Sequence, residues 1–273
     1  MAQTIACANQ KGGVGKTTTV VNLASRLATS TAARILVIDL DPQGNATSGF
    51  GVDRSTIAGS TYEALVDGAS LRALQVATSA PRVDLVPSAI ALAGAEVELA
   101  GADQRERRLR RAIEEVRDAY DLIFVDSPPS LGLLTVNALT AADTVLVPLQ
   151  CEYYALEGLT QLLATIDLVR DHLNPALVLD GVVLTMADGR TNLSADVAAE
   201  ARRHLGDLVY ETVIPRSVRL SEAPSHGMPI DRYAPDSRGA KAYADLAHEF
   251  LARRGPSLDT TVPVPTVKPG PSR

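Results

Sequence analysis

The segment TIACANQKGGVGKTT, residues 4–18, joins an apolar run to a glycine-rich turn that ends in Lys16 and Thr17. Apolar residues at helical spacing follow between Val20 and Ala28, so the glycines lie between a predicted strand and a predicted helix. Glycines at such a junction let backbone N–H groups surround a phosphate, and the start of the helix adds partial positive charge. An ordinary glycine turn is the competing interpretation. The Lys-Thr pair favours a phosphate-binding loop.

The side chains of this loop have separable chemical roles. Lys16 is expected to reach the β- and γ-phosphate oxygens of a nucleotide, and the Thr17 hydroxyl is expected to ligate Mg²⁺. The loop residues predicted to contact the nucleotide are Gly12, Gly13, Val14, Gly15, Lys16, Thr17 and Thr18.

Short apolar or β-branched runs recur along the chain and are separated by longer segments of helical periodicity. The runs are Thr4–Ala8, Ile35–Asp39, Val83–Val86, Leu122–Asp126, Thr144–Leu149, Gly181–Thr185 and Val209–Ile214. Strands that alternate with helices predict an α/β fold with a doubly wound, mostly parallel sheet flanked by helices. Hydrophobic residues make up 46 % of the chain, aromatic residues only 4 %, and Trp is absent, so the core must be built from Ala, Val, Leu and Ile.

The 273 residues suit one α/β domain followed by a tail. Helical spacing continues from Ala240 to Leu251 and stops at Gly255 and Pro256. Residues 255–273 contain five prolines and few bulky side chains, too little apolar surface to offset the entropy of ordering. We therefore expect one folded domain over residues 1–254 and a flexible Pro-rich tail over residues 255–273.

Charge and cysteine content restrict the setting in which the chain works. The formal net charge is −6, so any nucleic-acid binding must come from a local group of basic residues. Cys7 and Cys151 lie in or beside apolar runs without metal-ligand spacing, which predicts buried thiols in a reducing compartment. The sequence shows neither an apolar stretch of ~20 residues nor a leader, so we expect a soluble cytoplasmic protein that does not bind membranes.

A second helix is predicted near residues 98–119. One of its faces is apolar, and the remainder carries five arginines interleaved with acidic residues. The arginines are Arg105, Arg107, Arg108, Arg110 and Arg111. Interleaved charges of opposite sign favour a solvated face laced by salt bridges over a nucleic-acid patch.

The glycine loop departs from the standard pattern G-x-x-x-x-G-K-[ST], because Gln10 stands where that pattern has glycine and Lys11 is added. The stretch KGGVGKT, residues 11–17, resembles the deviant Walker A loop of the ParA/MinD ATPases. The resemblance implies that ATP is the nucleotide. It also implies that Lys11 reaches the nucleotide of a partner subunit, so that the chain forms an ATP-dependent homodimer.

Two further stretches, IDLDPQGN at residues 38–45 and VDSPP at residues 125–129, match motifs of the same family. The resemblance implies that Asp41 positions the attacking water, that Asp39 supports the loop and metal region, and that Asp126 holds Mg²⁺ through water. Carboxylates at the carboxyl ends of parallel strands lie where ligands bind. Considered without the resemblance, each aspartate could be a helix N-cap or a turn former. The predicted catalytic residues are Lys11, Lys16 and Asp41, and the predicted metal residues are Thr17, Asp39 and Asp126.

Residues 184–193 and 214–227 resemble the chromosomal ParA (Soj) branch of the family, so the resemblance covers almost all of residues 1–254. In relatives the matching segments flank the adenine. The residues of this chain that correspond are Met186, Pro215 and Arg216. The resemblance further implies that Arg190 and Arg219 contact DNA, although by themselves these two could be solvated loop residues.

The resemblance implies a DNA-partitioning ATPase for a chromosome or a plasmid. In this scheme ATP closes a dimer, the dimer binds nucleoid DNA without sequence preference, and a ParB-type partner stimulates hydrolysis and release. A MinD-like membrane-cycling ATPase is the alternative, but it requires an amphipathic C-terminal helix where this chain has prolines. A redox enzyme like the nitrogenase iron protein requires cysteines that hold an iron–sulfur cluster, and Cys7 lies within the first predicted strand. A ParA with an N-terminal DNA-reading domain is not expected, because the loop follows the first strand directly.

Overall fold

The computed structural model describes residues 1–152, 155–188 and 190–254, and these residues build one eight-stranded sheet with the order β3-β4-β2-β5-β1-β6-β7-β8. Its strands are β1 (Gln3–Cys7), β2 (Ile35–Asp39), β3 (Val76–Ala77), β4 (Val83–Val86), β5 (Leu122–Asp126), β6 (Thr144–Gln150), β7 (Val178–Ala187) and β8 (Val209–Pro215). All neighbouring strands are parallel except β3 and β4. The predicted doubly wound α/β fold is confirmed.

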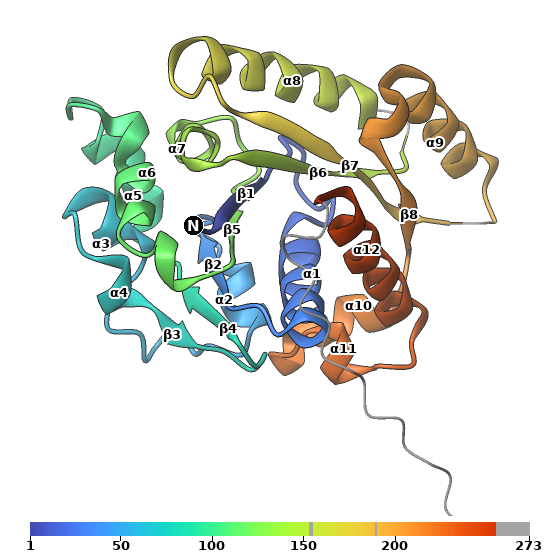
Figure 1. Ribbon diagram of the computed structural model, residues 1–273, viewed down its shortest axis with the longest axis horizontal. Helices are drawn as coiled ribbons and strands as arrows, with labels where there is room; N and C mark the ends of the chain where they lie inside the picture. The colour runs from blue at the N-terminus through green and yellow to red at the C-terminus, as the bar shows by residue number, and fades with distance from the viewer. Residues whose placement is uncertain (153–154, 189, 255–273) are drawn as a thin grey trace, which may run out of the picture.

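Helices cover both faces of the sheet, and Figure 1 shows it between α7 and α8 on one side and α1 and α12 on the other. The α-helices are α1 (Lys16–Thr31), α2 (Asn45–Gly49), α3 (Thr61–Val66), α4 (Leu71–Leu74), α5 (Leu92–Glu98), α6 (Arg108–Glu114), α7 (Leu133–Ala141), α8 (Ala155–His172), α9 (Asn192–Leu205), α10 (Val218–Glu222), α11 (Ile230–Tyr233) and α12 (Arg238–Arg254). Short 3-10 turns are η1 (Arg105–Arg107), η2 (Arg117–Ala119), η3 (Gly206–Leu208) and η4 (Ala223–His226).

The central strands are continuous apolar runs because they are covered on both faces. Every residue of β2 and of β5 is buried. One core cluster packs residues of α5 to α9 against the sheet, and the other packs residues of α1 and α12 against the opposite face. Cys7 and Cys151 are both buried free thiols, as the sequence predicted.

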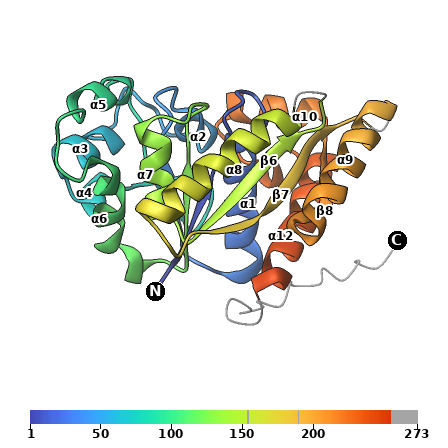
Figure 2. The same ribbon diagram turned by 90° about the horizontal axis from the view of Figure 1, so that it is seen from above.

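The strand register decides where the predicted site residues meet. Asp39 pairs with Asp126 at the ends of β2 and β5, and Asp126 also pairs with Cys7 at the end of β1. Parallel strands end at the same edge of a sheet, so this register brings the two aspartates to the carboxyl edge. Figure 2 shows α2, α5 and α10 along this edge, far from the N-terminus of the chain.

The helix predicted over residues 98–119 is wrong in its extent. α5 ends at Glu98, and the next α-helix begins only at Arg108, after a turn in which Gln104 has φ 51°. The buried Asn137 explains the interruption, because its side chain accepts the Leu109 N–H and donates to the Arg105 carbonyl. Tertiary hydrogen bonds replace helical ones there.

The salt-bridged face predicted for this helix is also mostly absent. Within the described chain, Arg105 pairs with Glu106, and no other arginine of the five forms an ion pair.

The predicted tail, residues 255–273, lies outside the described residues, so the division at residue 254 stays a prediction. Across residues 1–152, 155–188 and 190–254, we find no helix with the length and apolarity needed to cross a bilayer.

Candidate nucleotide and magnesium site

The loop between β1 and α1 has a backbone that requires glycine. Gly13 has φ 74° and Gly15 has φ 91°, both in the left-handed region, where residues with a Cβ are strained. Gly15 immediately precedes α1, whose first residue is Lys16. The loop therefore presents backbone N–H groups and the start of a 16-residue helix to one space.

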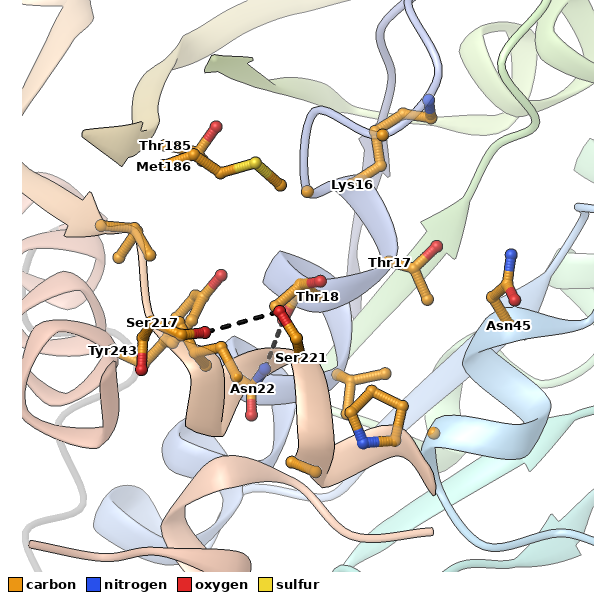
Figure 3. Close-up of a pocket in the computed structure, with 18 of the residues that line it drawn as sticks. Lys16, Thr17, Thr18, Asn22, Asn45, Thr185, Met186, Ser217, Ser221 and Tyr243 are labelled. Atoms are coloured by element: carbon orange, nitrogen blue, oxygen red, sulfur yellow. Dashed lines mark hydrogen bonds between the residues drawn. The ribbon is translucent and has the colours of Figure 1, made fainter. Parts of the chain in front are cut away.

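That space is a cavity of about 550 Å³, a size typical of nucleotide-sized ligands. Loop and strand ends form its walls together with η4, α10 and α12. Its lining includes Gly12, Gly13, Gly15, Lys16, Thr17, Thr18, Asn22, Asp41, Gln43, Asn45, Pro129, Thr185, Met186, Pro215, Arg216, Ser217, Leu220, Ser221, Met228 and Tyr243. Figure 3 draws Thr17 and Asn45 at one end of this cavity and Ser217 and Tyr243 at the other.

Most of the predicted nucleotide residues line this cavity, but Lys11 and Val14 do not. Val14 is buried, and its carbonyl accepts a 2.7 Å hydrogen bond from the Thr185 hydroxyl. This bond ties the loop to the end of β7. Val14 can therefore contribute its backbone to a phosphate while its side chain stays in the core.

Lys16, the first residue of α1, lines the cavity. Its side chain is buried, and its ammonium donates a 3.1 Å hydrogen bond to the carbonyl of Lys11 across the loop. Burial lowers the pKa of Lys16, while the negative charges of Asp126 and Asp41 act in the opposite direction. A buried ammonium with spare N–H donors is suited to bind anionic phosphate oxygens. Their negative charge would offset the hydration that the ammonium loses on burial.

Thr17 and Asp126 meet directly. The Thr17 hydroxyl donates a 2.7 Å hydrogen bond to Oδ2 of the fully buried Asp126, whose other oxygen, Oδ1, has no hydrogen-bond partner. Burial raises the pKa of Asp126 well above its ordinary value, and the nearby charge of Asp39 raises it further. An unpartnered buried carboxylate oxygen beside a hydroxyl fits Mg²⁺, a hard cation that takes oxygen ligands and keeps several waters.

Asp39 has a different function in the fold. Its Oδ2 accepts the backbone N–H of Thr47 at 2.8 Å and the Thr47 hydroxyl at 2.7 Å, and its Oδ1 accepts the N–H of Asp41 at 3.1 Å. Burial raises the pKa of Asp39 to about 6, against these hydrogen bonds. With both oxygens engaged, Asp39 organises the loop that carries Asp41.

Asp41 lies on the cavity wall, where its Oδ1 accepts the N–H of Gln43 at 2.9 Å. This bond makes Asp41 a turn former, the alternative that the sequence left open. The position is equally compatible with a role in orienting water, because Asp41 faces the same cavity as Lys16 and Thr17.

Lys11 is not among the residues that line the cavity. Its ammonium lies 2.8 Å from a carboxylate oxygen of Glu152, and both side chains are about two-fifths exposed.

The cavity is also lined by the residues that the resemblance linked to the adenine. Met186, Pro215 and Arg216 line it as predicted, and Met186 has φ 52°, an uncommon conformation for a residue with a Cβ. Asn22 and Tyr243 also line it but were missed. Asn22 lies one helical turn after Thr18, so its spacing could have revealed it. No sequence pattern indicates that Tyr243 lies near Asn22.

Arg190 and Arg219 lie on the exposed surface. Arg190 forms two hydrogen bonds to the Asp188 carboxylate, at 2.9 and 2.7 Å, and this pairing holds the pKa of Asp188 below its ordinary value. Arg219 pairs with Glu222 at 2.9 Å. Both guanidinium groups are thus accessible, and each has a neighbouring carboxylate.

Residues 2–179 match a protein family described as AAA domain. The chain is 56 % identical over 252 residues to the sporulation initiation inhibitor protein Soj of Bacillus subtilis, covering 92 % of this chain and 99 % of that protein. It is 51 % identical to the chromosome partitioning protein ParA of Myxococcus xanthus, with 92 % and 89 % covered.

Two solved structures show the fold and its ligands. A protein described as cobyrinic acid a,c-diamide synthase from Mycobacterium smegmatis, with a bound ATP analogue and magnesium, is 38 % identical with a TM-score of 0.82, over 96 % of this chain and 98 % of that one. The septum site-determining protein MinD of Pyrococcus horikoshii, complexed with Mg-ADP, is 26 % identical with a TM-score of 0.77, over 93 % and 98 %.

Proposed function

Because this chain belongs to the ParA/Soj family of chromosome-partitioning ATPases, we propose that it hydrolyses Mg-ATP to switch between a DNA-bound dimer and a free state. The observation that carries the proposal is the cavity in which Lys16, Thr17 and Asp41 converge beside the unpartnered oxygen of Asp126. ATP and Mg²⁺ are the cofactors, as in the solved relatives with bound nucleotide and magnesium.

The residues of the chain divide the work of phosphoryl transfer. Loop N–H groups and Lys16 bind the β- and γ-phosphates and stabilise the charge that develops on the transferred group. Thr17 and Asp126 would hold Mg²⁺, which would supply positive charge to neutralise the phosphates. Asp41 orients the attacking water, while Asp39 holds the Asp41 backbone through a hydrogen bond.

In the dimer, each subunit supplies a lysine to the nucleotide phosphates bound by its partner. Lys11 stands outside its own cavity and leaves Glu152 to reach the nucleotide of the partner. The dimer then places two copies of Arg190 and Arg219 on one body, and phosphate contacts made by linked arginines add in affinity. DNA, a second copy of the chain and a ParB-type activator are the proposed partners, and the proposed place of action is the nucleoid within the cytoplasm.

The relatives with the higher identities favour partitioning over a metabolic role. The ParA proteins named for chromosome partitioning share about half of their residues with this chain, whereas the structure named as a synthase shares 38 %. The MinD structure, at 26 %, adds no specific reason for membrane cycling.

The test is ATP turnover together with DNA binding measured without nucleotide, with ADP and with ATP. We expect ATP turnover that depends on Mg²⁺. We expect DNA binding with ATP, but not with ADP or without nucleotide. The Lys16→Ala variant should lose both, because the phosphates lose their buried cation. Equal DNA binding in all three nucleotide conditions would contradict the proposed switch.

A further inference from the structure

Glu96 of α5 reaches the start of α7, although it lies outside the nucleotide cavity. Its Oε1 accepts a 3.3 Å hydrogen bond from the N–H of Leu134. Gly132, which precedes α7, lies so close that a Cβ there would overlap the Glu96 carboxylate. Gly132 has φ −79°, a value open to any residue. A side chain at position 132 would therefore displace the Glu96 carboxylate without straining the backbone.

The contact has the chemistry of a helix cap supplied by another helix. The first N–H groups of a helix have no partners within it and carry partial positive charge. The residue that precedes α7 provides no side-chain cap, since it is glycine. Glu96 provides the missing acceptor and a negative charge from α5.

The segment between Asp126 and α7 connects this cap to the phosphate loop. Pro129 lines the nucleotide cavity and packs near the phosphate loop. A Cβ added to Gly12 would lie 3.7 Å from the Cβ of Pro129. Thr135 of α7 donates a 2.6 Å hydrogen bond to the carbonyl of Ser130. The position of residues 127–132 relative to the phosphates thus depends on where α7 begins.

We propose that Glu96 is a positioning residue for ATP hydrolysis, which holds residues 127–132 against the phosphate loop by capping α7. This inference rests on the proposed ATPase function. Lys16, Thr17 and Asp126 are carried by α1 and β5, whereas Glu96 bonds the start of α7. Loss of the cap therefore disturbs the geometry of turnover more than the binding of ATP.

The first experiment compares steady-state ATP turnover of wild type, Glu96→Ala, Glu96→Gln and the control Glu98→Ala. Glu98 is on the same helix with the same charge, but it bonds the Tyr62 hydroxyl. We expect kcat of Glu96→Ala to fall about tenfold with KM for ATP changed by less than about twofold, since small displacements near the reacting groups slow chemistry strongly. Glu96→Gln keeps an acceptor oxygen and should recover much of the rate, and Glu98→Ala should match wild type.

The second experiment is a double-mutant cycle with Gly132→Ala. Alone, this variant should lower kcat because its methyl displaces the carboxylate; combined with Glu96→Ala it should add no further loss. Additive losses, a KM that rises in proportion to the fall in kcat, or a wild-type rate for Glu96→Ala would each overturn the proposed cap. A wild-type protein without ATP turnover would instead overturn the proposed function, so the two failures are distinguishable.

Discussion

The proposed role of Lys11 in the dimer predicts how strongly changes at Lys11 and Glu152 should alter dimerisation. Replacing Lys11 with Ala should leave ATP binding by one chain intact, because Lys11 lies outside its own cavity. Hydrogen bonds to charged groups contribute roughly 1.5–3 kcal/mol each. Two symmetric contacts in a dimer then amount to about 3–6 kcal/mol, so the variant should dimerise roughly 100-fold to 10,000-fold more weakly, at about 1.4 kcal/mol for each factor of ten.

Glu152→Gln should act in the opposite direction. The ion pair is short, at 2.8 Å, but both side chains are about two-fifths exposed. Such surface pairs contribute at most about 1 kcal/mol, so releasing one Lys11 in each subunit gains no more than about 2 kcal/mol for the dimer. We expect dimerisation up to roughly 30-fold tighter than in wild type.

Sedimentation velocity with a slowly hydrolysed ATP analogue and Mg²⁺ measures both effects on one scale. ATP binding, followed separately by nucleotide fluorescence, serves as the control that each variant retains its site. A normal ATP-dependent dimer formed by Lys11→Ala would refute the assignment of Lys11 to the partner's nucleotide.

Three further predictions follow from single contacts. Asp41→Asn keeps an acceptor for the Gln43 N–H but loses the charge, so ATP hydrolysis should fall about 100-fold while ATP-dependent DNA binding persists, and a wild-type rate would leave Asp41 as a turn former only. Arg219→Ala should weaken binding to every DNA sequence and reduce the salt dependence, with dimerisation unchanged in sedimentation; equal affinity at several salt concentrations would exclude the contact. Glu249 accepts the N–H groups of Glu211 and Thr212 on the edge strand β8, so Glu249→Ala should lower the free energy of unfolding by about 1–3 kcal/mol in urea titrations. Burial works against ionisation of Glu249, but its hydrogen bonds outweigh burial and hold its pKa below the ordinary 4.5. Its contribution to the free energy of unfolding should therefore be present above pH 4.5 and be lost as the pH falls through the folded pKa. If the variant lost stability in acid just as wild type does, this would be contradicted.

The sequence predicted best those elements whose burial produces a recognisable apolar pattern. Strands covered on both faces, such as β2 and β5, are continuous apolar runs and were predicted almost to the residue. β3 is a two-residue edge strand with no periodicity, and it was missed. The interruption before α6 depends on Asn137, more than 20 residues away, which no local pattern contains.

The site shows the same division between local and distant causes. The phosphate loop was predictable because one contiguous stretch contains its glycines, its lysine and the start of the helix. The pairing of Thr17 with Asp126 depends on strand register, and Tyr243 reaches the cavity from the last described helix. Chemistry supplied by one segment can be read from sequence, whereas chemistry assembled across the sheet requires the fold.

The carboxylates beside the two exposed arginines bear on how ATP could control DNA binding. Asp188 holds Arg190 and Glu222 holds Arg219, so a DNA phosphate must compete with an existing partner at each position. With a net charge of −6, one chain offers DNA two partly neutralised arginines and general repulsion. The proposed dimer would present four arginines on one body, and after the first contact the others would bind at high effective concentration. In the proposed scheme the arginines themselves need not move, because the number that ATP holds together would decide whether DNA phosphates displace the carboxylates.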